Sequence, residues 1–239
     1  HVESGADATI AGIPVSRKDA SALGIMQVDD SGQVRGFVEK PQTEEAIESV
    51  RMEPSWIDAH GIPSRGRDCL ASMGLYIFNK STMVDLLNSN DHQDFGKEVF
   101  PEAINSHKVQ VHLFDGYWED IGTIRAFYEA NLNLAGSAPP FNIRTPDAPI
   151  YSRPRFLPPT IMGDTKITGS LIADGCRIGQ NVTISNSVIG LRTVVGDNVV
   201  IKDSVVMGAD FMDDPSKLAE GVLPLGIGSG TTIQGTILD

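Results

Sequence analysis

The sequence predicts an α/β chain in two parts: a mixed sheet covered by helices and, after it, a parallel β-helix. Short β-branched runs alternate with segments of helical spacing over residues 1–136, as expected for strands and helices that pack together. Residues 161–239 instead place Val, Ile and Leu at a fixed repeat. Between them, residues 137–160 are rich in proline, which lacks the amide donor of helices and strands, so we expect an ordered or semi-rigid connector.

The elements of the first part follow from local pattern. Glu44 and Glu45 suit the positive end of a helix over 43–52, and Ser81 is expected to cap a second helix. The clearest helix follows Thr123 as its N-cap and stops at Gly136. Its apolar face comprises Ile124, Phe127, Tyr128, Leu132 and Ala135. The runs that predict strands are 8–15, 23–29, 33–39, 70–78 and 109–114.

The second part repeats every 17 residues, because its apolar marks advance in steps of 6, 6 and 5. Three inward positions per repeat are typical of a parallel β-helix of triangular section, whereas a sandwich of valine-rich strands does not require such a repeat. Residues 207–226 break the pattern, which predicts a loop or a short helix there. The marks are Ile161, Ile167, Ile172, Ile178, Ile184, Ile189, Val195, Ile201 and Val206, then Ile227, Ile233 and Leu238.

Composition excludes several functions. Lys and Arg number 19 against 31 Asp and Glu, a formal charge of −12, which disfavours a nucleic-acid partner. No run is long and apolar enough for a membrane helix, and the first 20 residues lack a signal pattern, so we expect a soluble, intracellular protein. Cys69 and Cys176 lie far apart in the sequence and are expected to be plain thiols.

Both ends of the chain predict a fragment. The first residue is His1 rather than Met, and Asp239 falls in the middle of a predicted coil. Natural solenoids avoid an uncapped edge of this kind. We therefore expect the chain to be part of a longer protein.

Glu39 and Lys40 are the first candidate site residues. A strand that ends in these two residues places both charges at one end of the sheet, and Pro41 predicts an extended conformation for Lys40. An ammonium fixed at a strand terminus can bind phosphate. The alternative is a solvated ion pair before a turn, which contributes little.

Two further segments carry candidate groups. Asp120 follows a strand, precedes a helix and stands beside aromatic residues, at the kind of sheet edge where α/β proteins bind ligands. Its carboxylate could hold Mg²⁺ together with substrate phosphates and water, or it could serve only as a helix-capping acid. Within the strand at 70–78, Ser72 can bond a sugar hydroxyl, and Gly74 indicates close approach of a ligand or of another backbone.

Taken together and in order, these segments resemble the glucose-1-phosphate adenylyltransferases (ADP-glucose pyrophosphorylases) over the whole chain. The insert between Lys40 and Ser72 is more similar to the cyanobacterial and plant branch than to the shorter enteric form. The segments that carry the resemblance are AGIPV, SALGIMQVDDSGQVRGFVEKP, CLASMGLYIF, DFGKEVFP, VQVHLFDGYWEDIGTIRAFYEANLNL, PIYSRPRFLPPTIM and the coils with VVMGADF.

The resemblance implies the C-terminal part of a Rossmann-like nucleotidyltransferase domain, then a left-handed β-helix of hexapeptide repeats. It implies transfer of a nucleotidyl group from ATP to α-D-glucose 1-phosphate, giving ADP-glucose and pyrophosphate for glycogen or starch synthesis. Mg²⁺ is the implied cofactor, and the full-length form would be an allosteric homotetramer or heterotetramer. The implied compartment is the bacterial cytoplasm, or the plastid if the source is a plant.

Carried over by motif, the resemblance implies that Lys40 binds the sugar phosphate and takes part in catalysis. Glu39 and Ser72 would bind the glucose hydroxyls, and Gly24 would lie against the substrate, although LGI stands where many members have an aromatic before the glycine. Asp120 would be one of two catalytic aspartates that hold Mg²⁺.

An anionic effector site is a further implication of the resemblance, between the two domains. Three arginines of the connector could contribute to it, or they could belong to a solvated linker. These are Arg144, Arg153 and Arg155.

Several family features have no counterpart in the 239 residues: the glycine-rich nucleotide loop with its Thr-Arg, the catalytic basic residue and the second metal-binding aspartate. The chain is therefore expected to hold the sugar-phosphate half of an active site and to be inactive alone. Alternatives are a regulatory subunit of the same enzyme, another sugar-phosphate nucleotidylyltransferase, and an assembly module. A uridylyltransferase fused to a β-helix acetyltransferase is disfavoured, because residues 161–239 contain no histidine.

Overall fold

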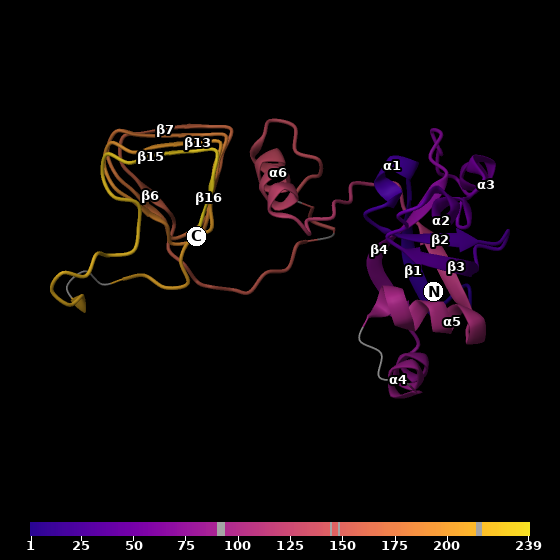
Figure 1. Cartoon of the computed structure of the whole chain (residues 1–239). Helices are drawn as coiled ribbons and strands as arrows, with labels where there is room; N and C mark the ends of the chain where they lie inside the picture. Colours follow the sequence, from indigo (N-terminus) through magenta and orange to yellow (C-terminus); the bar gives the residue numbers. More distant parts are fainter. Residues whose placement is uncertain (90–93, 144, 148, 214–216) are drawn as a thin grey trace. The chain divides into compact units, whose positions relative to one another are not determined.

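The computed structural model describes residues 1–89, 94–143, 145–147, 149–213 and 217–239. The chain forms two compact units, His1–Trp118 and Glu119–Asp239, and each is described by itself. Figure 1 shows the elements of both. The helix after Thr123 was assigned to the first predicted domain, 1–136, whereas its contacts group it with the second unit. Within the described part of the chain, no helix has the length and apolar character needed to cross a membrane.

The first unit is built on a five-stranded mixed sheet, in the order β3-β2-β4-β1-β5. β1 and β5 run parallel, and the other neighbours are antiparallel. All five predicted strands are confirmed to within one residue at each end. Their bounds are β1 Ala8–Val15, β2 Gly24–Val28, β3 Val34–Glu39, β4 Cys69–Phe78 and β5 Val109–Leu113.

The helices of this unit were predicted less completely. Thr43 caps α2 by accepting a hydrogen bond from the Ala46 amide. The predicted cap at Ser81 is wrong, because α4 begins one residue earlier and the Met83 amide donates to the Asn79 carbonyl. The helices are α1 Arg17–Ala20, α2 Glu44–Glu48, α3 Pro54–Ala59, α4 Lys80–Ser89, the wide π-helical turn η1 Phe95–Val99, and α5 Phe100–Ser106.

Two apolar clusters hold these helices against the sheet. The larger buries Ile10, Met26 and Leu70 of the strands against Phe100 of α5 and its neighbours. The smaller packs α1 and α2 through Ala20 and Ile47, beside Ile25, Cys69 and Ala71 of β2 and β4. β2 and β4 contribute fully buried residues to both clusters, so both faces of these strands are covered.

A charged network ties α1 and α2 to β4. The Asp68 carboxylate, whose side chain is 13% exposed, accepts hydrogen bonds from Arg17 Nε at 2.9 Å and Arg51 Nε at 3.2 Å. Arg17 also pairs with Glu44 and Glu48 of α2. Burial raises the pKa of Asp68, but Arg17 and Arg51 outweigh it and hold that pKa below its usual range.

Asp68→Asn is expected to destabilise the first unit by about 1.5–3 kcal/mol at pH 7, the usual weight of hydrogen bonds to a charged group. Because the folded pKa is lowered, this contribution is full above the unfolded pKa of about 3.9 and is lost as the pH falls through the folded pKa. Urea unfolding from pH 7 to pH 2 measures it. Asp30→Asn, at an exposed carboxylate, is the matched control. An Asp68→Asn deficit that stays constant down to pH 2 would contradict this account.

The second unit confirms the β-helix. β10 pairs with β7 and β13, and β11 pairs with β8 and β14, all in parallel and at a shift of 17 residues. The coils form the triangle seen in Figure 1. The strands are β6 Ile161–Met162, β7 Thr165–Thr168, β8 Leu171–Ile172, β9 Arg177–Ile178, β10 Val182–Ser185, β11 Val188–Ile189, β12 Val194–Val195, β13 Val200–Lys202, β14 Val205–Val206, β15 Thr232–Gln234 and β16 Ile237–Leu238.

The strand pairing differs from the predicted repeat at its first coil and confirms it at its last coil. Met162, not Ile161, is the partner of Ile178, and Ile161 is 66% exposed. Ile233 pairs with Ile201, so the repeat resumes after residues 207–226 as predicted. The described part of that excursion is mostly loop, with no α-helix.

One corner of each coil requires a left-handed backbone, and small polar residues supply it. Gly169, Asn186, Asp203 and Gly235 have φ between 44° and 62°, values that Gly and Asn adopt with least strain. Asn186 also donates its side-chain amide to the Asp203 carboxylate at 2.7 Å. These contacts bond one coil to the next, so the corners contribute to the stacking order together with the apolar interior.

Candidate functional site

Three neighbouring strands bring four of the predicted site residues together. Gly24 of β2 pairs with Glu39 of β3. β2 then meets β4 at the pair Ile25–Ala71, which places Gly24 and Ser72 at adjacent positions of the two strands. Lys40 follows directly, and its amide donates to the Leu23 carbonyl at 2.9 Å. One end of the sheet therefore carries Gly24, Glu39, Lys40 and Ser72.

Gly24 is required by the close approach of its neighbours. A Cβ at this position would lie 2.6 Å from Glu39 Oε2 and 2.7 Å from the ring of Phe37. Because antiparallel partners share one face of the sheet, the missing side chain lets the Glu39 carboxylate lie across β2. That carboxylate is 23% exposed, which argues against a fully solvated ion pair.

Lys40 differs from its predicted conformation. The prediction of an extended backbone before Pro41 is wrong, because Lys40 has φ +49°, in the left-handed region. Its ammonium lies 3.6 Å from Glu39 Oε1 and is 60% exposed. A left-handed conformation costs a lysine on the order of 1 kcal/mol and is typical of functional sites, where the surroundings hold it. The result is an accessible cation beside a half-buried carboxylate.

Asp94 lies beside this end of the sheet and was not among the residues predicted from the sequence. It caps η1, with Oδ1 accepting from the amides of Gly96 at 2.8 Å and Lys97 at 2.9 Å. These bonds, together with the Lys97 and Lys40 cations, hold the pKa of Asp94 below its usual range. A Cβ on Gly96 would lie 3.0 Å from Glu39 Oε2, so this turn closes on the site. An Asp followed by Gly and then a helical run could have indicated it.

Ser72 is 9% exposed, and Ser72 Oγ lies 3.4 Å from the hydroxyl of Tyr76. For Gly74, a close approach of a ligand or of another backbone was predicted. No other part of the protein approaches it closely, because a Cβ at this position would have no atom within 4 Å. Its φ of +70° and the register shift of β1 against β4 explain the glycine instead. Gly74 forms a bulge that turns the chain beyond Ser72.

Asp120 belongs to the second unit, in the loop before α6 (Ile124–Ala135). Its Oδ1 accepts a hydrogen bond from the Gly122 amide at 2.9 Å. Thr123, rather than Asp120, caps α6 by accepting from Ala126, so the helix-cap alternative is not supported. The carboxylate is exposed and keeps a second oxygen, and one carboxylate with phosphate and water suits Mg²⁺. Among the described residues, no cluster of three or more His, Cys, Asp or Glu could hold a metal.

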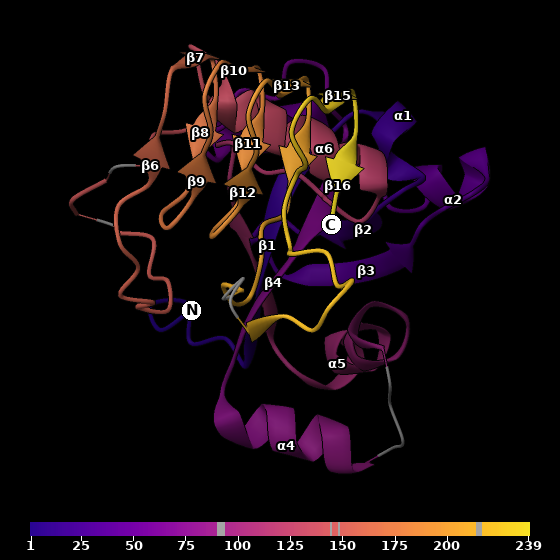
Figure 2. The ribbon, with the colours of Figure 1, turned by 90° about the vertical axis from the view of Figure 1, so that its left-hand side faces the viewer.

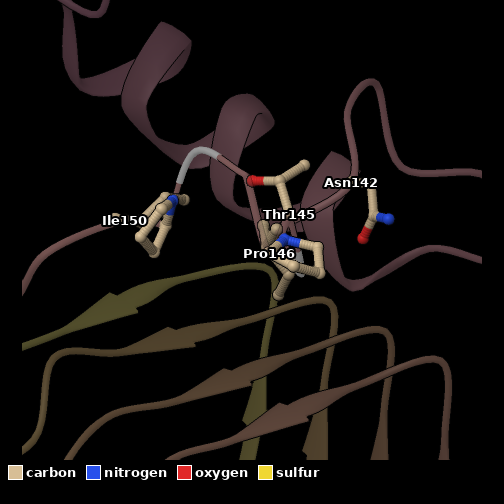
Figure 3. Close-up of a pocket in the computed structure, with 6 residues that line it drawn as sticks. Asn142, Thr145, Pro146 and Ile150 are labelled. Atoms are coloured by element: carbon tan, nitrogen blue, oxygen red, sulfur yellow. The ribbon is translucent and has the colours of Figure 1, made fainter.

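The connector offers an open cleft of about 770 Å³, seen in Figure 3. Its lining is Asn142, Ile143, Thr145, Pro146, Pro149 and Ile150. Neither Arg153 nor Arg155 lines it, and both are exposed, with Arg155 donating to the Arg153 carbonyl at 3.4 Å. Arg144, the third residue of the predicted effector set, lies outside the described residues.

Neither cysteine forms a disulfide, as predicted, and the structure buries both. Burial raises the pKa of the Cys69 thiol to about 11, with the Asp68 carboxylate adding to the effect. The thiol therefore stays protonated at neutral pH and is a poor nucleophile. Cys176 Sγ lies 3.1 Å from the Gly190 carbonyl inside the β-helix.

Comparison with known families defines the class of protein. Residues 1–137 match the family model described as nucleotidyl transferase. This match covers more than half of the chain, so the chain belongs to the nucleotidyl transferase family. Residues 155–239 match the model described as the GLGC left-handed parallel beta-helix domain. The two matches together describe a nucleotidyltransferase of the GLGC type, with a mixed sheet followed by a left-handed β-helix.

Proposed function

We propose that this chain carries the sugar-phosphate site of a glucose-1-phosphate adenylyltransferase. In the proposed reaction, a phosphate oxygen of α-D-glucose 1-phosphate attacks the α-phosphorus of ATP. The new P–O bond gives ADP-glucose, and the broken bond releases pyrophosphate. The observation that supports this most is the sheet end, where the Lys40 ammonium lies 3.6 Å from the Glu39 carboxylate and that carboxylate lies against Gly24.

The proposed roles follow from charge and position. Lys40 would bind the phosphate of the sugar, because its accessible ammonium can donate several hydrogen bonds. Glu39 would accept hydrogen bonds from the glucose hydroxyls, and the Ser72 hydroxyl would donate a hydrogen bond to them or accept one from them. Gly24 would leave room for the ring of the sugar. Nucleotidyl transfer depends mainly on orientation and on cations near the reacting phosphates, and Lys40 would supply one of these cations.

Asp120 is the proposed Mg²⁺ ligand. A bound Mg²⁺ would neutralise charge on the phosphates of ATP and orient them. The exposed carboxylate and its second oxygen fit that role, while the Gly122 amide fixes the first oxygen.

The proposal also includes the assembly and the regulation of the whole enzyme. By resemblance, the whole enzyme would serve glycogen or starch synthesis as a homotetramer or heterotetramer. The exposed guanidinium groups of Arg153 and Arg155 would contribute to an anionic effector site.

The test uses Glu39→Gln, which removes one charge and keeps the size of the side chain. We expect glucose 1-phosphate to bind about tenfold more weakly, because hydrogen bonds from sugar hydroxyls to a charged carboxylate are replaced by weaker ones. Inorganic phosphate should bind equally well or more tightly, since a negative charge next to Lys40 is gone. Isothermal titration of the full chain with both ligands measures the difference.

Glu45→Gln, on the exposed face of α2, is the matched control and should leave both affinities unchanged. Equal weakening of glucose 1-phosphate and inorganic phosphate by Glu39→Gln would mean that Glu39 does not contact the sugar. Unchanged binding of both would remove Glu39 from the site.

A further inference from the structure

α6 packs on one face of the β-helix. The strands that it contacts, β11 and β14, are each two residues long. Both positions of these strands are apolar: Ile189 of β11 and Val206 of β14 belong to the buried cluster inside the β-helix, whereas Val188 and Val205, the alternate positions, do not. A strand that is apolar on both sides indicates that both faces are covered. α6 contacts β11 and β14, and Figure 2 shows it running along the coils.

Tyr128 gives this packing a fixed polar contact. Its hydroxyl donates a hydrogen bond to the Asp203 carbonyl at 2.5 Å. That carbonyl belongs to a corner with φ +47°, and the corner is itself held, since the Asp203 carboxylate accepts from Asn186 at 2.7 Å. The Asp203 amide also donates to the Ser185 carbonyl at 3.0 Å. Tyr128 is therefore bonded to a residue that two further hydrogen bonds hold within the β-helix.

The same end of α6 carries the Asp120 loop. Thr123 accepts from the Ala126 amide at 3.1 Å, and the Phe127 amide donates to the Thr123 carbonyl at 3.0 Å, so the first turn is well formed. Two residues before Gly122, Asp120 is bonded to the Gly122 amide at 2.9 Å. A continuous series of hydrogen bonds and helix backbone thus leads from the β-helix corner, through Tyr128 and the first turn of α6, to the Asp120 carboxylate.

We propose that Tyr128 is a positioning residue through which the β-helix sets the place of the Asp120 carboxylate. In this proposal, the β-helix positions the loop that carries the proposed Mg²⁺ ligand. This inference rests on the proposed function for the role of Asp120, and on the structure for the coupling. Ile124, predicted on the apolar face, is 81% exposed, so it does not anchor the first turn. Tyr128 is half-buried and lies one turn further along.

The test compares Tyr128→Phe with Tyr151→Phe in the full chain. Both remove one phenolic hydroxyl, but Tyr151 is 91% exposed in the connector. We expect Tyr128→Phe to speed amide exchange at Gly122, Ala126 and Phe127 by about fivefold, the weight of one hydrogen bond. Mn²⁺, used as the probe for the metal site and followed by water-proton relaxation, should bind more weakly by a similar factor. Tyr151→Phe should change neither quantity.

Two results of the exchange measurement would contradict the coupling, and a third result would contradict it through Mn²⁺ binding. One is unchanged exchange at the first turn of α6 in Tyr128→Phe. The other is faster exchange throughout the β-helix, at Ile184 and Ile201 as well, because the hydroxyl would then support the whole unit rather than the loop. Faster exchange confined to the first turn, with Mn²⁺ affinity unchanged, would make the contact structural only and would also contradict the proposal.

Asp120→Asn separates this inference from the proposed function. If Asp120→Asn weakens Mn²⁺ binding and Tyr128→Phe does not, the positioning role is wrong and the metal role stands. If Asp120→Asn leaves Mn²⁺ binding unchanged, the metal role is wrong. The exchange measurement then still decides whether Tyr128 holds the loop.

Discussion

Ile184→Ala is expected to destabilise the β-helix by about 2–5 kcal/mol, the usual cost of a large aliphatic cavity. Ile184 is fully buried and stands in register between Ile167 and Ile201 of the neighbouring coils. Each coil contacts only the coils next to it, so a cavity in the middle removes contacts on both sides. Amide exchange of β10 and β13 in increasing urea measures the loss.

Val200→Ala is the matched control, because Val200 faces outward and is 40% exposed. It should cost less than about 1 kcal/mol, since it leaves no internal cavity. The two variants together test the inward and outward positions of the repeat. Equal destabilisation by both would contradict the assignment of Ile184 to the interior.

The β-helix could be predicted in detail because one physical requirement recurs in every coil. Each coil must present apolar residues inward at the same three positions, and the 17-residue repeat in the sequence reports that requirement directly. The prediction was wrong at Ile161, in the first coil, where a strand has a neighbour on one side only. Pairing with β9 there places Met162, rather than Ile161, opposite Ile178.

The first unit was predictable in its strands but not in its short helices. α1 and α3 have four and six residues, too few to show a helical period. Their places are decided by tertiary contacts, such as the bonds of Arg17 to Asp68 and Glu44. Tertiary contacts also decided that α6 packs on the β-helix, although the doubly apolar strands at Val188 and Val205 are a signal that could have indicated a covering element.

The candidate site was predicted by residue type, while its geometry was not. The sequence indicated Glu39 and Lys40 because a strand that ends in these residues places both charges at one end of the sheet, where an ammonium can bind phosphate. The left-handed backbone of Lys40 could not be predicted, since Pro41 favours the opposite conformation. The closure of the Asp94 turn on Glu39 depends on residues more than 50 positions apart, which local pattern does not reveal.

The largest expected effect on binding is that of Lys40→Ala. In the proposed site, removing the ammonium would delete a charge-assisted contact to the phosphate, which is worth about 1.5–3 kcal/mol, or roughly 10- to 100-fold in affinity. Lys40→Arg keeps the positive charge and should retain part of the affinity. The free enzyme should fold normally, because the side chain of Lys40 is 60% exposed and its pairing with Glu39 contributes little.

Lys80→Ala, at the exposed start of α4, is the matched control for the loss of one lysine. It should leave the affinity for glucose 1-phosphate unchanged. Lys80→Ala changes the net charge by the same amount as Lys40→Ala. Because the chain has a formal charge of −12, this control shows whether net charge alone affects the binding of an anion.

Titration of the wild-type chain, Lys40→Ala and Lys80→Ala with glucose 1-phosphate under identical salt tests whether Lys40 binds a sugar phosphate. If the sheet end at Glu39 and Lys40 is a sugar-phosphate site, the wild type and Lys80→Ala bind equally and Lys40→Ala binds at least about tenfold more weakly. Equal affinity in all three proteins would contradict the account and remove Lys40 from the site.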